Sequence, residues 1–129
     1  MLTKYDPERA PDPARWLAEG EAQRIDIIQR FHRRTETGLP RPRVHAVMHM
    51  VVENQVAMPD EVAVAATVDR LMRDGLSRHE AIHAVGHVLL PFMARVAQTE
   101  EPFDTDAYDQ ALRDLTVEEW RGATVEDQN

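Results

Sequence analysis

Two stretches of the chain carry metal-ligating side chains at intervals of four residues. The first stretch contains His45, His49 and Glu53, and the second contains His79, His83 and His87. Residues four apart on a helix differ by about 40° around the axis and about 6 Å along it, so each triplet lines one narrow stripe. A histidine pair at this spacing is a common bidentate chelate for a transition-metal ion.

The ends of each triplet are about 12 Å apart along a helix axis, too far for one ion with bonds of about 2.1 Å. Each helix should therefore offer two ligands to one ion, and a third member would serve a second ion or orient a ligand. Antiparallel packing of the two helices predicts three facing pairs, which are His45 with His87, His49 with His83, and Glu53 with His79. These pairs could hold one ion or two.

The chain has no cysteine, which excludes disulfides, iron–sulfur clusters, thiolate zinc sites and cysteine nucleophiles. Any metal must be held by nitrogen and oxygen, and ligation rich in imidazole suits zinc, nickel, copper or iron(II). A metal-free alternative stays open, in which these histidines form a buried hydrogen-bond network with Glu53, Asn54 and Gln55. The chain would then be a non-catalytic interaction module.

The segment His79–His83 also matches H-E-x-x-H, a zinc peptidase signature in which Glu80 would be the general base. Glu80 has another role, however, because it occupies the third position of a capping box that begins at Ser77. No strong third ligand completes the motif, although Glu53 is a candidate. We treat a zinc hydrolase as the lesser alternative.

Composition limits the partners of the protein. The formal net charge of −8 argues against sequence-independent binding of nucleic acid. The densest basic stretch is interpreted as a solvated face, with a phosphate site as the alternative; it consists of Arg30, Arg33, Arg34, Arg41 and Arg43. No apolar run approaches the roughly 18 residues of a membrane span. We therefore expect a cytoplasmic protein without membrane contact, and leave open a homo-oligomer, a protein partner and the substrate.

Three motifs of the sequence resemble one family. They are His45-x-x-x-His49, Val52-Glu53-Asn54-Gln55 and Gly75-Leu-Ser-Arg-His79-Glu80-Ala-Ile-His83, and the similarity extends to Ala22–Arg24 and Phe31–Arg33. The pattern resembles a family of small uncharacterised bacterial all-helical proteins. The resemblance implies that these histidines and Glu53-Asn54-Gln55 form one signature, and it implies no substrate and no catalytic role.

The elements that position these residues are all predicted to be helices. Asp12-Pro13 predicts a helix start, and this helix ends near Thr35, with Gly20 as a weak point inside it. His32, near its end, is interpreted as a partner of the helix dipole, with an accessory role at the site left open. Residues 43–58 form a second helix that is apolar on most sides, typical of the buried centre of a bundle.

Capping residues predict the later starts at Pro59, Ser77, Asp104 or Asp106, and Thr116. Pro91 should kink or end the helix that begins at Ser77. The fold is predicted to be all-α, a compact antiparallel bundle of about five helices. We expect an irregular arm over residues 1–11, one helical domain over residues 12–121 and a frayed tail over residues 122–129. The leading hypothesis is a transition-metal site between the second and fourth helices.

Overall fold

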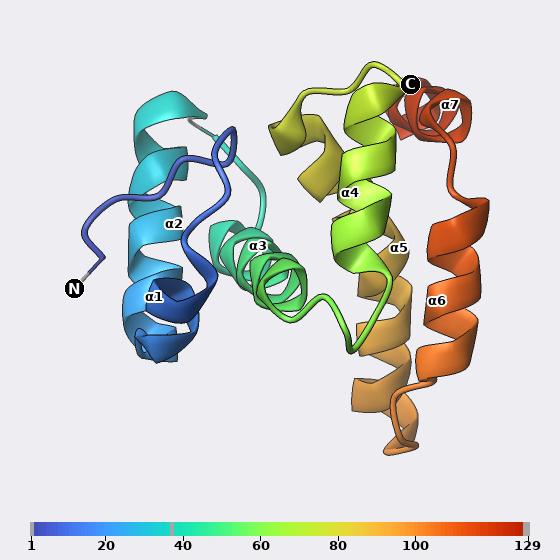
Figure 1. The fold of residues 1–129 in the computed structure, drawn as a ribbon, viewed down its shortest axis with the longest axis horizontal. Helices are drawn as coiled ribbons and strands as arrows, with labels where there is room; N and C mark the ends of the chain where they lie inside the picture. The colour runs from blue at the N-terminus through green and yellow to red at the C-terminus, as the bar shows by residue number, and fades with distance from the viewer. Residues whose placement is uncertain (1, 37, 128–129) are drawn as a thin grey trace.

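The chain is described by a computed structural model over residues 2–36 and 38–127, and in these residues all regular secondary structure is helical (Figure 1). The helices are α1 (Pro13–Ala18), α2 (Glu21–Thr35), α3 (Pro42–Ala57), α4 (Val64–Arg73), α5 (Arg78–Thr99), α6 (Thr105–Asp114) and α7 (Val117–Asp127). The all-α prediction is confirmed, and the described residues form seven helices where about five were predicted. None of the helices in the described ranges is both long and apolar enough to span a membrane.

Two local features account for the additional helices. Gly20 adopts an extended conformation (φ −65°, ψ 150°) and is the N-cap of α2, so the first predicted helix is divided into α1 and α2. Near the C-terminus, Thr116 Oγ1 accepts a hydrogen bond from the backbone N–H of Glu119 at 3.1 Å. This capping box begins a further helix, α7, which continues to Asp127, past residue 122 where the sequence predicted a frayed tail to begin.

The capping predictions at three other helices agree with the structure. The side chains of Asp12, Ser77 and Asp104 each accept a hydrogen bond from a backbone N–H in the first turn of α1, α5 and α6. Pro91 lies inside α5 and does not end it. Because Pro91 is exposed, the helix can continue past the hydrogen bond that proline cannot make.

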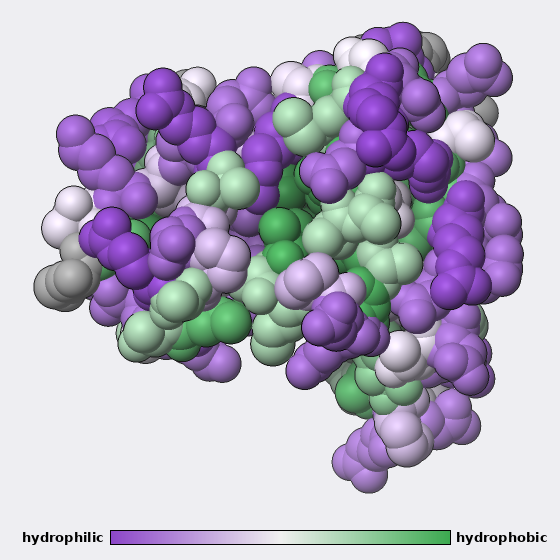
Figure 2. Space-filling view, viewed as in Figure 1, coloured by the Kyte–Doolittle hydropathy of each residue, from purple (hydrophilic) through white to green (hydrophobic). Residues whose placement is uncertain are grey.

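Helix α3 lies at the centre of the molecule and is shared by two hydrophobic cores. Met48 and Val52 face a core built with α4, α5, α6 and α7. Ala46 and Met50 face a second core built with the N-terminal arm, α1 and α2. This arrangement explains why α3 is apolar on most sides. Figure 2 shows that hydrophobic residues gather along the middle of the viewed face, while hydrophilic residues line its outer edges.

Three consecutive polar residues of α3 connect it to different parts of the chain. Glu53 accepts hydrogen bonds from Tyr5 and Arg78. Asn54 accepts hydrogen bonds from Trp16 of α1 and Arg24 of α2, and Gln55 accepts one from Tyr108 of α6. The Glu53-Asn54-Gln55 segment therefore holds the arrangement of the helices around α3, and it makes no direct hydrogen bond to the described histidines.

Helices α3 and α5 cross steeply and do not run antiparallel as predicted. In Figure 1, α3 is viewed nearly along its axis, whereas α5 runs down the picture beside α4 and α6. At the crossing, a Cβ on Gly86 would overlap Met48 Sδ and Cγ, so glycine permits the close approach. A crossing of this kind limits the contact between α3 and α5 to a few turns, which decides which histidines meet.

Candidate metal centre

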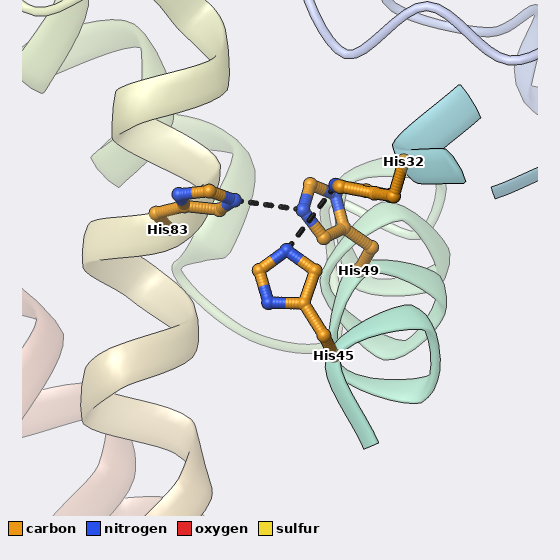
Figure 3. A group of neighbouring side chains, drawn as sticks. All are labelled: His32, His45, His49 and His83. Atoms are coloured by element: carbon orange, nitrogen blue, oxygen red, sulfur yellow. Dashed lines mark hydrogen bonds between the residues drawn. The ribbon is translucent and has the colours of Figure 1, made fainter. Parts of the chain in front are cut away.

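Four histidines from three helices meet where α2, α3 and α5 come together (Figure 3). One ring nitrogen from each lies within 4.8 Å of the others, and the set consists of His32, His45, His49 and His83. His32 and His49 are buried, and His45 and His83 are partly buried. We call these residues the four-histidine group. It lies at the boundary between the two hydrophobic cores, where α2 and α5 approach α3 from different sides.

The Nε2 atoms of this group have separations suited to a metal ion. His49 Nε2 lies 2.9 Å from His83 Nε2, and His45 Nε2 lies 3.2 Å from His32 Nε2. Tetrahedral ligands with metal–nitrogen bonds of about 2.1 Å are separated by about 3.4 Å. Only small side-chain rotations would therefore bring the nitrogens onto one ion.

The tautomer of His32 follows from its hydrogen bond to its own helix. His32 Nδ1 lies 2.9 Å from the backbone carbonyl oxygen of Ile28. A carbonyl oxygen can only accept, so Nδ1–H is the donor. In the neutral ring, the lone pair of Nε2 is then free and faces the other histidines.

The tautomer of His49 is determined by a chain of buried partners. Arg78 donates to both carboxylate oxygens of Glu53, at 2.7 and 2.9 Å, and the Tyr5 hydroxyl donates to the same carboxylate at 2.7 Å. Because the only hydroxyl hydrogen of Tyr5 is used there, its oxygen accepts from His49 Nδ1–H at 3.0 Å. The lone pair of His49 Nε2 consequently points at His83. Orientation of a ligand ring through its other nitrogen is a regular feature of metal sites.

Burial keeps the imidazoles of His45, His49 and His83 uncharged. Desolvation, followed by the neighbouring His32, lowers the pKa of His45 to about 4. Desolvation, followed by His79 and His45, lowers the pKa of His83 to about 3. The pKa of His49 is lowered further, by desolvation first and then by His83. Neutral imidazole is the form that binds a metal ion. Near pH 7 these rings therefore do not have to change from the charged to the neutral form before an ion binds.

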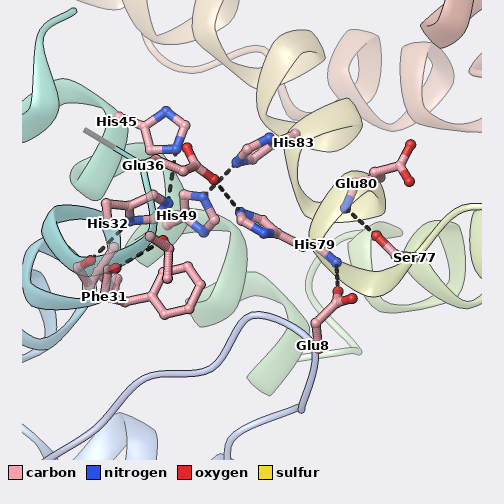
Figure 4. Close-up of polar contacts among 12 residues, drawn as sticks. Glu8, Phe31, His32, Glu36, His45, His49, Ser77, His79, Glu80 and His83 are labelled. Atoms are coloured by element: carbon pink, nitrogen blue, oxygen red, sulfur yellow. Dashed lines mark hydrogen bonds and ion pairs between the residues drawn. The ribbon is translucent and has the colours of Figure 1, made fainter. Parts of the chain in front are cut away.

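A second group adjoins the first and shares His32 with it. It contains His32, Glu36 and His79. His79 Nε2 is buried without a hydrogen-bond partner among the described residues and lies 3.9 Å from Glu36 Oε1 (Figure 4). The backbone N–H of His79 donates to the carboxylate of Glu8, so the N-terminal arm holds the first turn of α5 at this place.

The structure separates two predicted site residues, His87 and Glu53, from the imidazoles. His87 is exposed, and its ring packs 5.7 Å from that of Trp120. The predicted pairing of His45 with His87 is wrong because α5 crosses α3 steeply, and the ring of His45 instead lies 4.8 Å from that of His83. The predicted pairing of Glu53 with His79 is also wrong, since Glu53 contacts Arg78 and Tyr5 and reaches His49 only through Tyr5.

Glu80 is not placed as the general base of a peptidase. Its side chain is exposed and points away from the imidazoles in Figure 4. Its backbone N–H donates to Ser77 Oγ at 3.1 Å, as the capping box predicts. His79 and His83 do lie together, with ring centroids 4.3 Å apart. The motif therefore contributes its two histidines to the site while its glutamate caps the helix.

Two residues of the site, His32 as a central member and Glu36, were missed by the sequence analysis. A signal for both was present, because Ile28, His32 and Glu36 follow the same four-residue spacing as the two triplets. Ile28 belongs to the apolar stripe of α2 and is fully buried, which places His32 on the inward face. The position of His32 near the end of the predicted helix favoured the interpretation as a dipole partner instead.

The amino-acid sequence matches a family model described as "Domain of unknown function (DUF1841)" over residues 21–114. The matched segment includes every residue of the two groups of ligand-type side chains, and it leaves out Tyr5 and Glu8. Neither the curated proteins nor the solved structures give a match.

Proposed function

We propose that this chain, which belongs to the DUF1841 family of domains of unknown function, binds a divalent transition-metal ion through its four-histidine group. The ligands would be the Nε2 atoms of His32, His45, His49 and His83. Zinc, nickel, copper and iron(II) all suit a site built from imidazole without thiolate.

The observation that carries this proposal is the direction of two lone pairs. His32 and His49 each use Nδ1–H in a buried hydrogen bond, to a carbonyl and to Tyr5 respectively. Both rings therefore present an unprotonated Nε2 to the same space. Without a cation, the lone pairs of His32 Nε2 and His49 Nε2 are acceptors that need hydrogen bonds from His45 and His83. A metal ion satisfies all four nitrogens together.

Glu36 and His79 lie at the edge of this centre and extend what it could do. Their side-chain atoms are close enough to His32 for the three residues to hold a second ion. A carboxylate beside a metal-bound water could also act as a base. The proposal is metal binding alone.

Elemental analysis of untagged protein tests the proposal. Cells are grown with zinc, nickel, copper or iron supplied in turn, and the metal content is measured after gel filtration. About one equivalent or more of one metal is expected. Less than about half an equivalent of every metal would contradict the proposal, because a site with preoriented ligands should retain its ion through purification.

Three histidine variants make this measurement specific. His49→Ala and His83→Ala should lose the bound metal, whereas the matched control His87→Ala should retain it, because His87 lies on the same helix as His83 but outside the group. Circular dichroism verifies that each variant is folded. Equal metal content in all three would show that the ion is bound elsewhere.

A metal-free interaction module is the alternative that the geometry also permits. The Nε2 pairs at 2.9 and 3.2 Å are within hydrogen-bond distance, with His83 donating to His49 and His45 donating to His32. This alternative predicts that His83→Ala lowers the melting temperature equally with and without a chelator. The metal proposal predicts a smaller loss of melting temperature when the chelator is present, because the wild type has then lost its ion too.

The cytoplasmic location stays a prediction from the sequence.

A further inference from the structure

A pocket opens on the side of the metal centre formed by α2 and the start of α3. Its volume is about 320 Å³, and its lining includes Gln29, His32, Arg33 and Glu36 of α2, together with Leu39 and Pro42. We propose that this pocket binds a small anionic ligand, a carboxylate or a phosphate, beside the metal ion. This inference rests on the proposed function and adds the class of ligand.

The pocket and the metal centre share two residues. His32 belongs to the four-histidine group, and Glu36 belongs with His32 to the second group. His32 is 4% exposed, so it forms the floor of the pocket while its Nε2 faces the other imidazoles. A ligand in the pocket would therefore lie against His32 and Glu36, and displacement of the Glu36 carboxylate would let an oxygen of the ligand reach the ion.

The charge of the pocket favours an anion. Arg33 lines it and makes no ion pair with any described residue, whereas Arg30, one turn earlier, pairs with Asp26 at 2.8 Å. Pro42 begins α3, whose N-terminus has no capping side chain, and the positive end of the helix dipole faces this region. With a divalent ion bound, these positive charges exceed the single negative charge of Glu36.

The size and the walls of the pocket limit the ligand further. A volume near 320 Å³ lies at the lower end of ligand pockets, which span about 300–1,000 Å³. It admits a small molecule and excludes a folded partner or a nucleic-acid duplex. Leu39 and Pro42 offer apolar contact to a short carbon chain, while Arg33 and Gln29 offer hydrogen-bond donors to oxygens.

Cobalt-loaded protein allows the ligand to be observed directly. Acetate, succinate and inorganic phosphate are added in separate titrations, with acetamide as the neutral control, and the visible absorption of the ion is recorded. We expect at least one anion to change the spectrum in a saturable way and acetamide to leave it unchanged. The anion with the lowest dissociation constant shows whether the pocket prefers a carboxylate or a phosphate.

Arg33→Gln and Arg34→Gln are the paired variants for this titration. They remove the same charge from adjacent exposed positions of α2, but only Arg33 lines the pocket. Loss of a charge-assisted contact should weaken anion binding about tenfold or more in Arg33→Gln and leave Arg34→Gln close to wild type. Equal anion affinity in both variants would overturn the proposal.

Metal content, measured before each titration, separates this proposal from the function on which it rests. If the protein binds metal but none of the three anions alters its spectrum, the ligand pocket is wrong and the metal site stands. If the protein binds no metal, both proposals fail.

Discussion

The two ring nitrogens of His49 have different partners, and this asymmetry is the most informative detail at the scale of single residues. Nδ1–H donates to Tyr5, which is itself held by the buried Glu53–Arg78 pair. Nε2 faces the imidazole of His83. The pKa of Tyr5 is raised well above its usual value by burial, followed by the charge of Glu53, so its hydroxyl keeps its hydrogen and the chain of donors is stable.

Removal of the Tyr5 hydroxyl should weaken metal binding without removing a ligand. Tyr5→Phe leaves His49 Nδ1–H without its acceptor, and loss of such a partner lowers metal affinity roughly 10- to 100-fold. Tyr108→Phe is the matched control, because Tyr108 is also buried and donates to Gln55 away from the histidines. Each variant should lose about 1 kcal/mol of stability. Competition with a chelator dye measures the affinities, and equal affinities would contradict the role of Tyr5.

The lowered pKa values of His45 and His83 predict the pH dependence of the metal-free protein. The unfolded chain takes up protons on these rings below about pH 6.5, whereas the folded protein resists until pH values near 4 and 3. The unfolded state therefore binds more protons in this window, and the free energy of unfolding should fall as the pH decreases from about 6.5 toward 4.

Urea denaturation at a series of pH values, with chelator present, measures this slope. His45→Gln and His83→Gln should make it shallower. His87→Gln should leave it unchanged, because the ring of His87 is exposed. A wild-type protein whose stability does not change between pH 4 and 6.5 would show that these histidines are accessible to protons when folded.

At the scale of elements, the steep crossing of α3 and α5 decides the composition of the site. The crossing brings His49 to both His79 and His83, with ring centroids 5.3 and 4.9 Å apart. It leaves His87 on the exposed side of α5. Helix α2 then contributes His32, which lies 4.5 Å from the ring of His45. Three elements, not two, are therefore needed to assemble the imidazoles.

Gly86 lies at this crossing, and its replacement by alanine tests the close approach of α3 and α5. Gly86→Ala places a methyl group against the buried Met48 side chain, and overpacking of this kind costs about 1–3 kcal/mol. Met48→Ala in the same chain should relieve part of that cost, which thermal denaturation of the double variant measures. Gly122→Ala is the control, since no atom lies within 4 Å of its added Cβ and alanine favours the helix. Equal effects of the two glycine changes would contradict the close approach.

At the scale of the whole molecule, the four-histidine group joins parts of the chain that belong to different cores. His32 comes from α2, which packs in the core of the N-terminal half, and His83 comes from α5, which packs in the other core. Both halves meet on α3. An ion bound to all four histidines would therefore connect the two cores directly, in addition to the Glu53–Arg78 pair.

Metal should therefore stabilise the whole fold and not only the site. A ligand that binds the native state at 100 times its dissociation constant adds about 2.7 kcal/mol, so the melting temperature should rise with metal and fall with chelator. The change should disappear in His49→Ala and His83→Ala and persist in His87→Ala. A melting temperature independent of metal in the wild type would contradict a bound ion that joins the cores.

Local signals in the sequence were sufficient for the helices and most of their starts. Asp12, Ser77 and Thr116 cap helices because their side chains accept from backbone N–H groups a few residues later, an interaction that needs no tertiary partner. The central position of α3 followed from its apolar surface, and the facing pair His49–His83 from the regular spacing. The sequence did not predict the division at Gly20 or the full length of α7. Contacts with neighbouring helices decide how far a weakly favoured helix continues.

The sequence by itself determined that five imidazoles lie on one-sided stripes of two helices and that no thiolate competes with them, because helical periodicity and composition are local properties. Only the tertiary structure decided which imidazoles meet. It added His32 and Glu36, excluded His87, and made Glu53 an indirect partner through Tyr5. The reason is geometric: the crossing of α3 and α5 and the approach of α2 depend on packing between residues far apart in the chain, which spacing within one helix does not encode.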